Sequence, residues 1–236
     1  WRENGYEIVV SSFMDKAMWS IVYTRGNYLQ KVLGTIRGYT RRILDIFSVR
    51  QFDVVYVFMW VTPIGTSLFE RIFRRLAVCL IYDIEDNVLM GKSNNVNPLM
   101  GLLKGPNKTK YLIETADHVI TSSPFLNDYC RSINRRQACT FISSSVDTEL
   151  FLPVNSYSND KKVIIGWTGT FSSKVYLDLL RDVFFELNKR VDFKLRVIGN
   201  FQYEFPGIDI EIIQWSKERE VQDLQAIDIG IYPLAQ

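Results

Sequence analysis

The sequence has 236 residues, of which 47% are hydrophobic and 23% charged, and its 28 Lys and Arg against 26 Asp and Glu give a formal net charge of +2. This near balance excludes a protein that coats nucleic acid, since such proteins carry a strong basic excess. The apolar content excludes a disordered chain, and the length corresponds to between one and two domains of roughly 150 residues.

Short β-branched runs alternate with longer amphipathic segments in the first part of the chain. This alternation predicts an α/β fold with a parallel sheet covered by helices. We predict strands at 7–13, 53–59, 78–82, 118–121 and 138–142, and helices at 28–47, 67–76, 108–115 and after Ser123-Pro124. Residues 91–107 hold three Gly, two Pro and four Asn, so a long loop is expected there.

A polar, turn-rich segment at residues 153–162 divides the sequence. We interpret it as a linker between a first domain, 1–152, and a second domain, 163–236. The second domain repeats the alternation, with strands predicted at 163–167, 194–198, 208–213 and 229–232 and helices at 175–188 and 218–226. Because the chain lacks an initial Met and stops soon after its last predicted strand, we expect a piece of a longer protein with an incomplete second domain.

The segment after the strand 163–167 has the features of an anion-binding turn. It contains Thr168, Gly169 and Thr170, and Lys174 follows in the first turn of a predicted helix. Glycine lets the backbone approach a ligand closely, and free N–H groups at a helix start attract anions such as a diphosphate. The alternative is an ordinary turn capped by a serine. Neither the Walker pattern nor the dinucleotide-binding glycine pattern is present.

Other candidate site residues also follow predicted strands, where ligands bind in open α/β sheets. Asp83 and Asp86 are suited to orient sugar hydroxyls or act as a base, and with Glu85 they could hold a divalent cation. The alternative for all three is a solvated turn. Gly199 allows a ligand to pass close to the backbone, although turn geometry alone explains a glycine there. Trp215 is interpreted either as a core residue or as a platform beside a nucleobase.

The single histidine and the three cysteines argue against several kinds of chemistry. His118 lies at the start of a predicted strand, where a structural role is expected. We therefore do not expect a catalytic triad that depends on histidine. The cysteines Cys79, Cys130 and Cys139 lack C-x-x-C spacing, which favours neither a disulfide framework nor a zinc site. We therefore expect a reducing, cytoplasmic setting. No apolar run reaches the roughly 20 residues that a membrane-spanning helix needs.

Residues 28–50 combine an apolar stripe with basic side chains. One interpretation is that the stripe packs on the sheet while the basic residues face water. The other is peripheral contact with the inner face of a membrane, since a basic amphipathic helix can lie on an anionic bilayer.

Several segments together resemble the retaining family 4 glycosyltransferases, which have the GT-B fold of two Rossmann-like lobes with parallel sheets. The motifs, in chain order, are ETADHVITSS at 114–123, SSVDTELFLP at 144–153, IGWTGT at 165–170, LRVIG at 195–199 and EVQDLQAIDIGIYPL at 220–234. Each motif is short, and the resemblance lies in their order and spacing.

The resemblance implies a metal-independent hexosyltransferase without a resident cofactor. Such an enzyme moves a sugar from a nucleoside-diphosphate sugar to a saccharide or lipid-linked acceptor, here in cell-surface polysaccharide or glycolipid synthesis. The family's catalytic glutamates, spaced E-x7-E, would follow Gln236. A non-catalytic two-lobe nucleotide or sugar binding protein is the alternative. The residues implied to face the diphosphate are Thr168, Gly169, Thr170 and Lys174, those near the nucleoside are Gly199 and Trp215, and those lining the acceptor side are Asp83 and Asp86.

Overall fold

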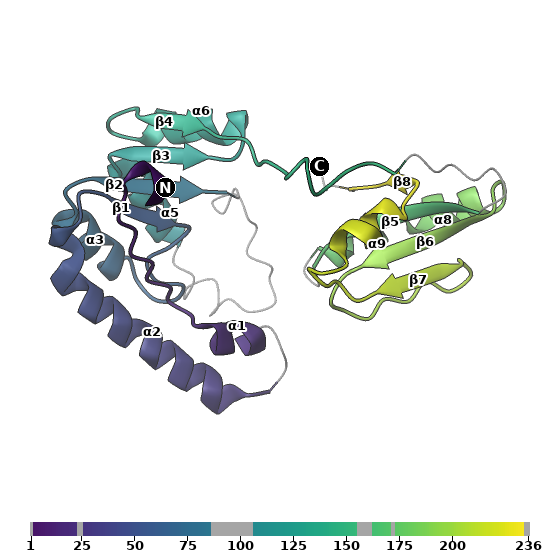
Figure 1. The fold of residues 1–236 in the computed structure, drawn as a ribbon, viewed down its shortest axis with the longest axis horizontal. Helices are drawn as coiled ribbons and strands as arrows, with labels where there is room; N and C mark the ends of the chain where they lie inside the picture. Colours follow the sequence, from purple (N-terminus) through teal and green to yellow (C-terminus); the bar gives the residue numbers. More distant parts are fainter. Residues whose placement is uncertain (1, 23–25, 86–105, 155–161, 171–172, 234–236) are drawn as a thin grey trace. The chain divides into compact units, whose positions relative to one another are not determined.

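Two compact α/β units make up the chain (Figure 1). The computed structural model describes residues 2–22, 26–85, 106–154, 162–170 and 173–233. Unit 1 runs from Trp1 to Ser144 and unit 2 from Ser145 to Gln236. Each unit contains a four-stranded sheet whose neighbouring strands are all parallel. This confirms the predicted α/β class with two parallel sheets.

The sheet of unit 1 has the strand order β1-β2-β3-β4. Its strands are β1 (Val55–Phe58), β2 (Leu80–Ile84), β3 (His118–Thr121) and β4 (Cys139–Phe141). The helices are α1 (Lys16–Val22), α2 (Tyr28–Ser48), α3 (Leu68–Leu76), α5 (Pro106–Thr115) and α6 (Pro124–Ile133). The core forms where α5 and α6 meet the central strands, and its most buried members include Leu80, Tyr82, Leu112, Ile113 and Val119.

The strand predicted at 7–13 is wrong, because residues 6–12 have no regular secondary structure. Val9 and Val10 of this segment are 61% and 80% exposed. The reason is that side chains of α2 form hydrogen bonds with backbone carbonyls of this segment. The carbonyl of Ser11 accepts a hydrogen bond from the Arg42 guanidinium of α2 at 2.8 Å, and Arg41 donates to the carbonyl of Ser12. Side chains of a helix therefore occupy carbonyls that a neighbouring strand would otherwise have paired.

The sheet of unit 2 has the strand order β7-β6-β5-β8. Its strands are β5 (Val163–Thr168), β6 (Phe193–Ile198), β7 (Ile210–Ile213) and β8 (Ile229–Gly230). Its helices are α7 (Lys174–Asp178), α8 (Arg181–Asn188) and α9 (Glu220–Gln225). The buried side chains of Trp167, Leu177, Phe184, Phe193, Leu195 and Val197 form its core.

The single helix predicted at 175–188 is divided into α7 and α8. The amides of Leu179 and Leu180 donate to carbonyls three residues earlier, at 3.2 and 3.1 Å. Such bonds tighten the last turn of α7 and interrupt the α-helical ladder. Asp178 ends this first helix and accepts hydrogen bonds from both Arg181 and Tyr203 at 2.8 Å.

Of the two interpretations of residues 28–50, packing of the apolar stripe on the sheet is wrong. The stripe of α2 faces away from unit 1, and Leu29 and Phe47 are 73% and 78% exposed. The side of the helix that is buried carries Gly38 and Arg42. Among the described helices, none is long and apolar enough to cross a bilayer.

Candidate functional site

Three strands of unit 2 end level with one another. Thr168 at the end of β5 is paired with Ile198 of β6, which is paired with Ile213 of β7. The ladder continues one residue further, because the amide of Gly169 donates to the Ile198 carbonyl at 3.1 Å and that of Gly199 to the Ile213 carbonyl at 3.0 Å. The structure therefore brings Thr168, Gly169 and Gly199 together at the carboxyl edge of the sheet, where open α/β sheets bind ligands.

Both glycines are required by the close approach of the turns that follow β5 and β6. A Cβ atom on Gly199 would lie 2.6 Å from the carbonyl oxygen of Gly169. A Cβ atom on Gly169 would lie 2.5 Å from the Trp167 ring and 2.7 Å from the Ser173 hydroxyl. Packing within the protein thus explains the two glycines independently of any ligand.

Several backbone amides of the turn after β5 donate hydrogen bonds within the turn itself. The Thr170 amide donates to the Ser173 hydroxyl at 2.8 Å, while the amides of Ser173 and Lys174 donate to the Thr170 carbonyl at 3.0 and 3.2 Å. The expectation of free amides is therefore not met at these positions. The Ser173 hydroxyl closes the turn through Thr170, but it makes no capping hydrogen bond to the amides of α7. An anion arriving here would first meet side chains, among them Thr170 and the partly exposed Lys174 at the start of α7.

Trp215 lies two residues beyond β7, at the same edge of the sheet. Its side chain is 40% exposed, so it is not a core tryptophan. The indole Nε1 donates a hydrogen bond to Oε1 of Glu220 at 3.1 Å, and Glu220 is the first residue of α9. This bond holds the ring at the surface of unit 2.

The carboxyl edge of unit 1 contains Asp83. It is paired with Phe58 of β1, and its backbone carbonyl accepts a hydrogen bond from the Met59 amide at 3.0 Å. The hydroxyl of Tyr56 donates to its carboxylate. Partial burial and then the bond to Asp83 raise the pKa of Tyr56 above its ordinary value, so the phenol remains protonated. Asp86, the second predicted carboxylate, lies outside the described residues, and among those that are described no three His, Cys, Asp or Glu side chains gather as metal ligands.

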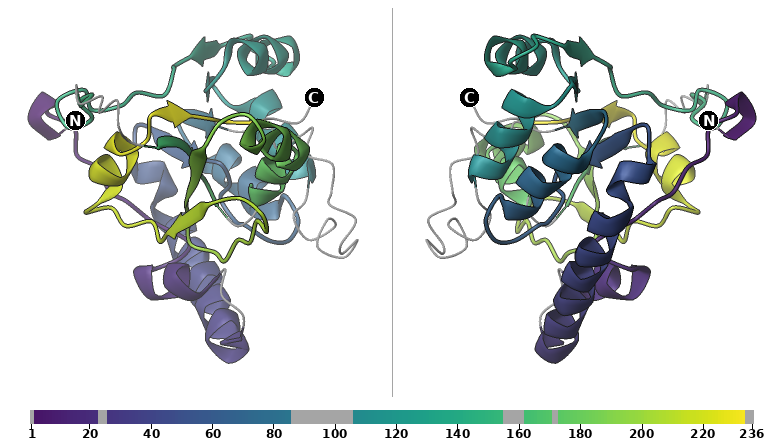
Figure 2. Two further views of the ribbon diagram at one scale, coloured as in Figure 1. Left: turned by 90° about the vertical axis from the view of Figure 1, so that its right-hand side faces the viewer. Right: turned by 90° about the vertical axis from the view of Figure 1, so that its left-hand side faces the viewer.

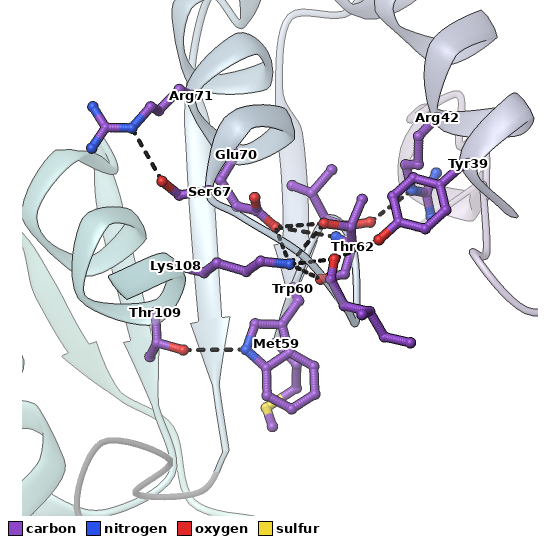
Figure 3. A network of polar contacts seen from close by, with 12 residues as sticks. Tyr39, Arg42, Met59, Trp60, Thr62, Ser67, Glu70, Arg71, Lys108 and Thr109 are labelled. Carbon is purple, nitrogen blue, oxygen red and sulfur yellow. Dashed lines mark hydrogen bonds and ion pairs between the residues drawn. The ribbon is translucent and has the colours of Figure 1, made fainter. Parts of the chain in front are cut away.

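A buried polar network beside this edge was not anticipated from the sequence (Figure 3). Lys108 of α5 and Glu70 of α3 are both fully buried and point toward Thr62. The Lys108 ammonium donates to the carbonyl and hydroxyl of Thr62 at 2.8 and 2.9 Å and to the carbonyl of Ile64 at 2.8 Å. Oε1 of Glu70 lies 3.9 Å from Lys108 and accepts from the amide and hydroxyl of Thr62, both at 3.2 Å.

Burial lowers the pKa of Lys108, and Glu70 opposes this shift. The ammonium is surrounded by oxygen acceptors, an arrangement that makes a buried positive charge tolerable. The sequence signal was weak, because Lys108 follows the loop-like residues 105–107 and resembles an exposed lysine. The network's structural effect is to fix residues 62–64.

Neighbouring residues of this segment have anchors of their own. Arg42 of α2 donates to the carbonyl of Val61 at 2.8 Å, and the Tyr82 hydroxyl donates to that of Met59 at 2.9 Å. The Trp60 indole donates to the Thr109 hydroxyl at 3.2 Å. The segment from 59 to 64, which follows β1 next to Asp83, is therefore held by α2, α3, α5 and β2. Such a supporting shell is what a preorganised binding edge requires.

Comparison with known proteins identifies the fold. No protein-family model and no curated protein matches the sequence. Among solved structures the chain is similar to sucrose-phosphate synthase from Thermosynechococcus elongatus, with a TM-score of 0.59 and 13% sequence identity over 85% of this chain. The match spans 55% of the synthase chain. At this level of identity the likeness concerns the fold alone, and it supports two Rossmann-like parallel-sheet units of the GT-B type.

Proposed function

We propose that the chain takes part in glycosyl transfer from a nucleoside-diphosphate sugar to a saccharide or lipid-linked acceptor. The observation that carries the proposal is the fold shared with sucrose-phosphate synthase, a glycosyltransferase, over 85% of the chain. The motif resemblance refines the proposal to a retaining, metal-independent hexosyltransferase of family 4, acting at the cytoplasmic side in surface polysaccharide or glycolipid synthesis.

The proposal assigns the donor to the carboxyl edge of unit 2. The exposed ring of Trp215 would stack on the base, and Gly199 would lie beneath the nucleoside. The side chains of Thr168 and Thr170 would reach the diphosphate. When the sugar leaves, negative charge grows on the phosphates, and the ammonium of Lys174 would stabilise it without a metal ion. Because the amides of Thr170, Ser173 and Lys174 are already hydrogen-bonded, the lysine side chain would carry more of this task than these amides.

The proposal assigns the acceptor to the carboxyl edge of unit 1. Asp83 offers a carboxylate that can accept a hydrogen bond from a sugar hydroxyl, and Tyr56 already uses it in this way. The rigid segment from 59 to 64 would form one wall of the acceptor site. We propose that Asp86 lines the same side.

Calorimetry of the 236-residue chain against uridine-, guanosine- and adenosine-diphosphate sugars tests the proposal. Binding of at least one donor is expected, and Trp215→Ala should weaken it by about 5- to 150-fold, since stacking of a base on an aromatic ring contributes about 1–3 kcal/mol. Trp19→Ala, at an exposed tryptophan of unit 1, is the matched control and should leave the affinity unchanged. Binding of no member of the panel would contradict the proposal.

Two further outcomes separate the remaining alternatives. Donor binding that survives EDTA supports metal independence, whereas its loss would favour a metal held by carboxylates such as Asp83 and Glu85. Donor binding without transfer of a radiolabelled sugar to any acceptor would favour the non-catalytic binding protein.

A further inference from the structure

The apolar side of α2 forms a stripe that faces solvent. Its members are spaced by three, four or seven residues, with Thr40 between Ile36 and Ile43, so they lie on one side of the helix. They are Leu29, Val32, Leu33, Ile36, Ile43, Leu44 and Phe47, all exposed. The 21 residues of α2 correspond to a length of about 31 Å at 1.5 Å per residue. Figures 1 and 2 show the helix at the margin of unit 1, with its first turns extending beyond the sheet beside α1.

Specific contacts impose this orientation. The inward side of α2 holds the buried guanidinium of Arg42, which donates to the carbonyls of Val61 and Ser11, both at 2.8 Å. Gly38 lies against Phe13 so closely that a Cβ atom would be 2.6 Å from the ring. Rotating the helix to bury its apolar stripe would break these hydrogen bonds and separate these surfaces. The contacts of the inward side therefore fix the rotation of α2 and keep its apolar stripe exposed.

The charge of α2 indicates what the stripe contacts. The helix contains four basic residues, Lys31, Arg37, Arg41 and Arg42, and a single acidic one, Asp45. Asp45 is paired with Arg42 and accepts a hydrogen bond from Ser11 at 2.8 Å. Arg37 is exposed and forms no ion pair with any described residue. Arg42 and Asp45 neutralise each other on the inward side, so the partly or fully exposed Lys31, Arg37 and Arg41 leave α2 with a net charge of +3. This charge would repel a second copy of the helix and attract an anionic surface.

We propose that α2 docks in the plane of an anionic lipid bilayer, with its apolar stripe in the boundary between headgroups and acyl chains. Amphipathic helices of this length, with a basic polar side and no excess of overall hydrophobicity, bind membranes in this way. Arg37 follows Ile36 at the margin of the stripe, and in this arrangement its exposed guanidinium would meet lipid phosphates. This inference is independent of glycosyl transfer and does not rest on the donor or acceptor site.

Flotation of the 236-residue chain with lipid vesicles tests the inference. Vesicles of phosphatidylcholine with about 30% phosphatidylglycerol, which supplies anionic headgroups, should bind the protein at least tenfold more strongly than phosphatidylcholine alone. Raising the salt to about 0.5 M should weaken binding, because it screens the charges. Equal binding to both kinds of vesicle, or to neither, would overturn the inference.

Variants distinguish membrane binding by the stripe from non-specific binding by any exposed apolar side chain. The triple change Leu29→Gln, Ile36→Gln and Phe47→Gln alters only exposed side chains and should reduce binding at least tenfold while the circular dichroism spectrum stays the same. The matched control replaces three exposed apolar residues elsewhere by Gln, namely Val78, Phe125 and Val183, and should bind like the parent. If the triple variant binds equally well, or if the parent forms a dimer that the triple variant abolishes, a lipid surface is not what covers α2.

Discussion

Replacing Lys108 by methionine should strongly destabilise unit 1. The change removes the ammonium that donates to Thr62 and Ile64. It also leaves the Glu70 carboxylate buried with no positive partner, and Oε2 of that carboxylate already has no hydrogen-bond partner among the described atoms. Removing one member of a buried ion pair costs about 3–5 kcal/mol, because the remaining charge is uncompensated. We expect the free energy of unfolding to fall by this amount.

The neighbouring lysine of the same helix provides the control. Lys110 has a side chain that is 58% exposed and lies 3.8 Å from Glu114, whereas the side chain of Lys108 is fully buried. Exposed pairs of this kind contribute about 0.3–0.5 kcal/mol, so Lys110→Met should have little effect. Urea unfolding followed by tryptophan fluorescence measures both variants, since Trp60 is bonded to Thr109 beside the network. With a slope of about 2 kcal/mol per molar urea, Lys108→Met should lower the midpoint by about 1.5–2.5 M.

A double variant identifies the source of the loss. If the unpaired charge dominates, Glu70→Leu combined with Lys108→Met should recover part of the stability, because replacing both members of a buried pair by apolar groups is often tolerated. If the hydrogen bonds to residues 62–64 dominate, the double variant should be no more stable than Lys108→Met. Equal stability of Lys108→Met and Lys110→Met, within about 0.5 kcal/mol, would refute the structural role of the network.

Three other predictions follow from the packing of the two units. Gly199→Ala should lower stability by about 1–3 kcal/mol, because its Cβ atom would lie 2.6 Å from a backbone oxygen, whereas Gly230→Ala meets no atom within 4 Å; a thermal shift of equal size for both would contradict this. Burial raises the pKa of the Cys130 thiol to about 12, so alkylation of the native protein, followed by peptide mass spectrometry, should modify the partly exposed Cys79 at least tenfold faster. Burial also raises the pKa of Tyr82 above its ordinary value of 10, so stability is fully present below pH 10 and lost as the pH rises further; Tyr82→Phe should flatten this alkaline loss in urea midpoints, and an unchanged slope would count against it.

Local signals were sufficient for most of the elements. The strands β1 and β2 were predicted from short apolar runs, and β2 is largely buried, as expected for a strand covered on both faces. β1 forms at the edge of the sheet, and its side chains Tyr56 and Phe58 are exposed, so burial on both faces was not correctly predicted there. The start of α6 was predicted from Ser123 and Pro124, and the Ser123 hydroxyl accepts a hydrogen bond from the Leu126 amide at 3.2 Å. The edge at Gly169 and Gly199 was also foreseeable, because parallel strands end at the same side of a sheet. These features depend on residues that are close together in sequence or on a general rule of topology.

Features that depend on distant partners were not predictable. Lys108 and Lys110 are two residues apart in one helix, and only the positions of Glu70 and Thr62, about 40 residues earlier in the chain, decide which lysine is buried. The strand predicted at 7–13 has a suitable composition, yet strand formation requires a neighbour with free backbone groups. The carbonyls of Ser11 and Ser12 are instead bonded to arginines of α2. The composition of a segment indicates which secondary structure it can adopt, but the hydrogen-bond partners of its backbone determine which one it adopts.

The orientation of α2 shows the same limit most clearly. The period of its apolar residues predicts a helix with two unlike sides, but this period carries no information on which side faces the protein. The usual assumption that the apolar side turns inward fails here because the opposite side offers more specific contacts, namely the Arg42 hydrogen bonds and the close approach of Gly38 to Phe13. An apolar stripe that stays exposed to water costs free energy, because transfer of apolar surface out of water is favourable. That cost is removed when the stripe enters the boundary between lipid headgroups and acyl chains. Binding to a lipid surface therefore explains the exposed side of α2, whereas the stability of unit 1 alone does not.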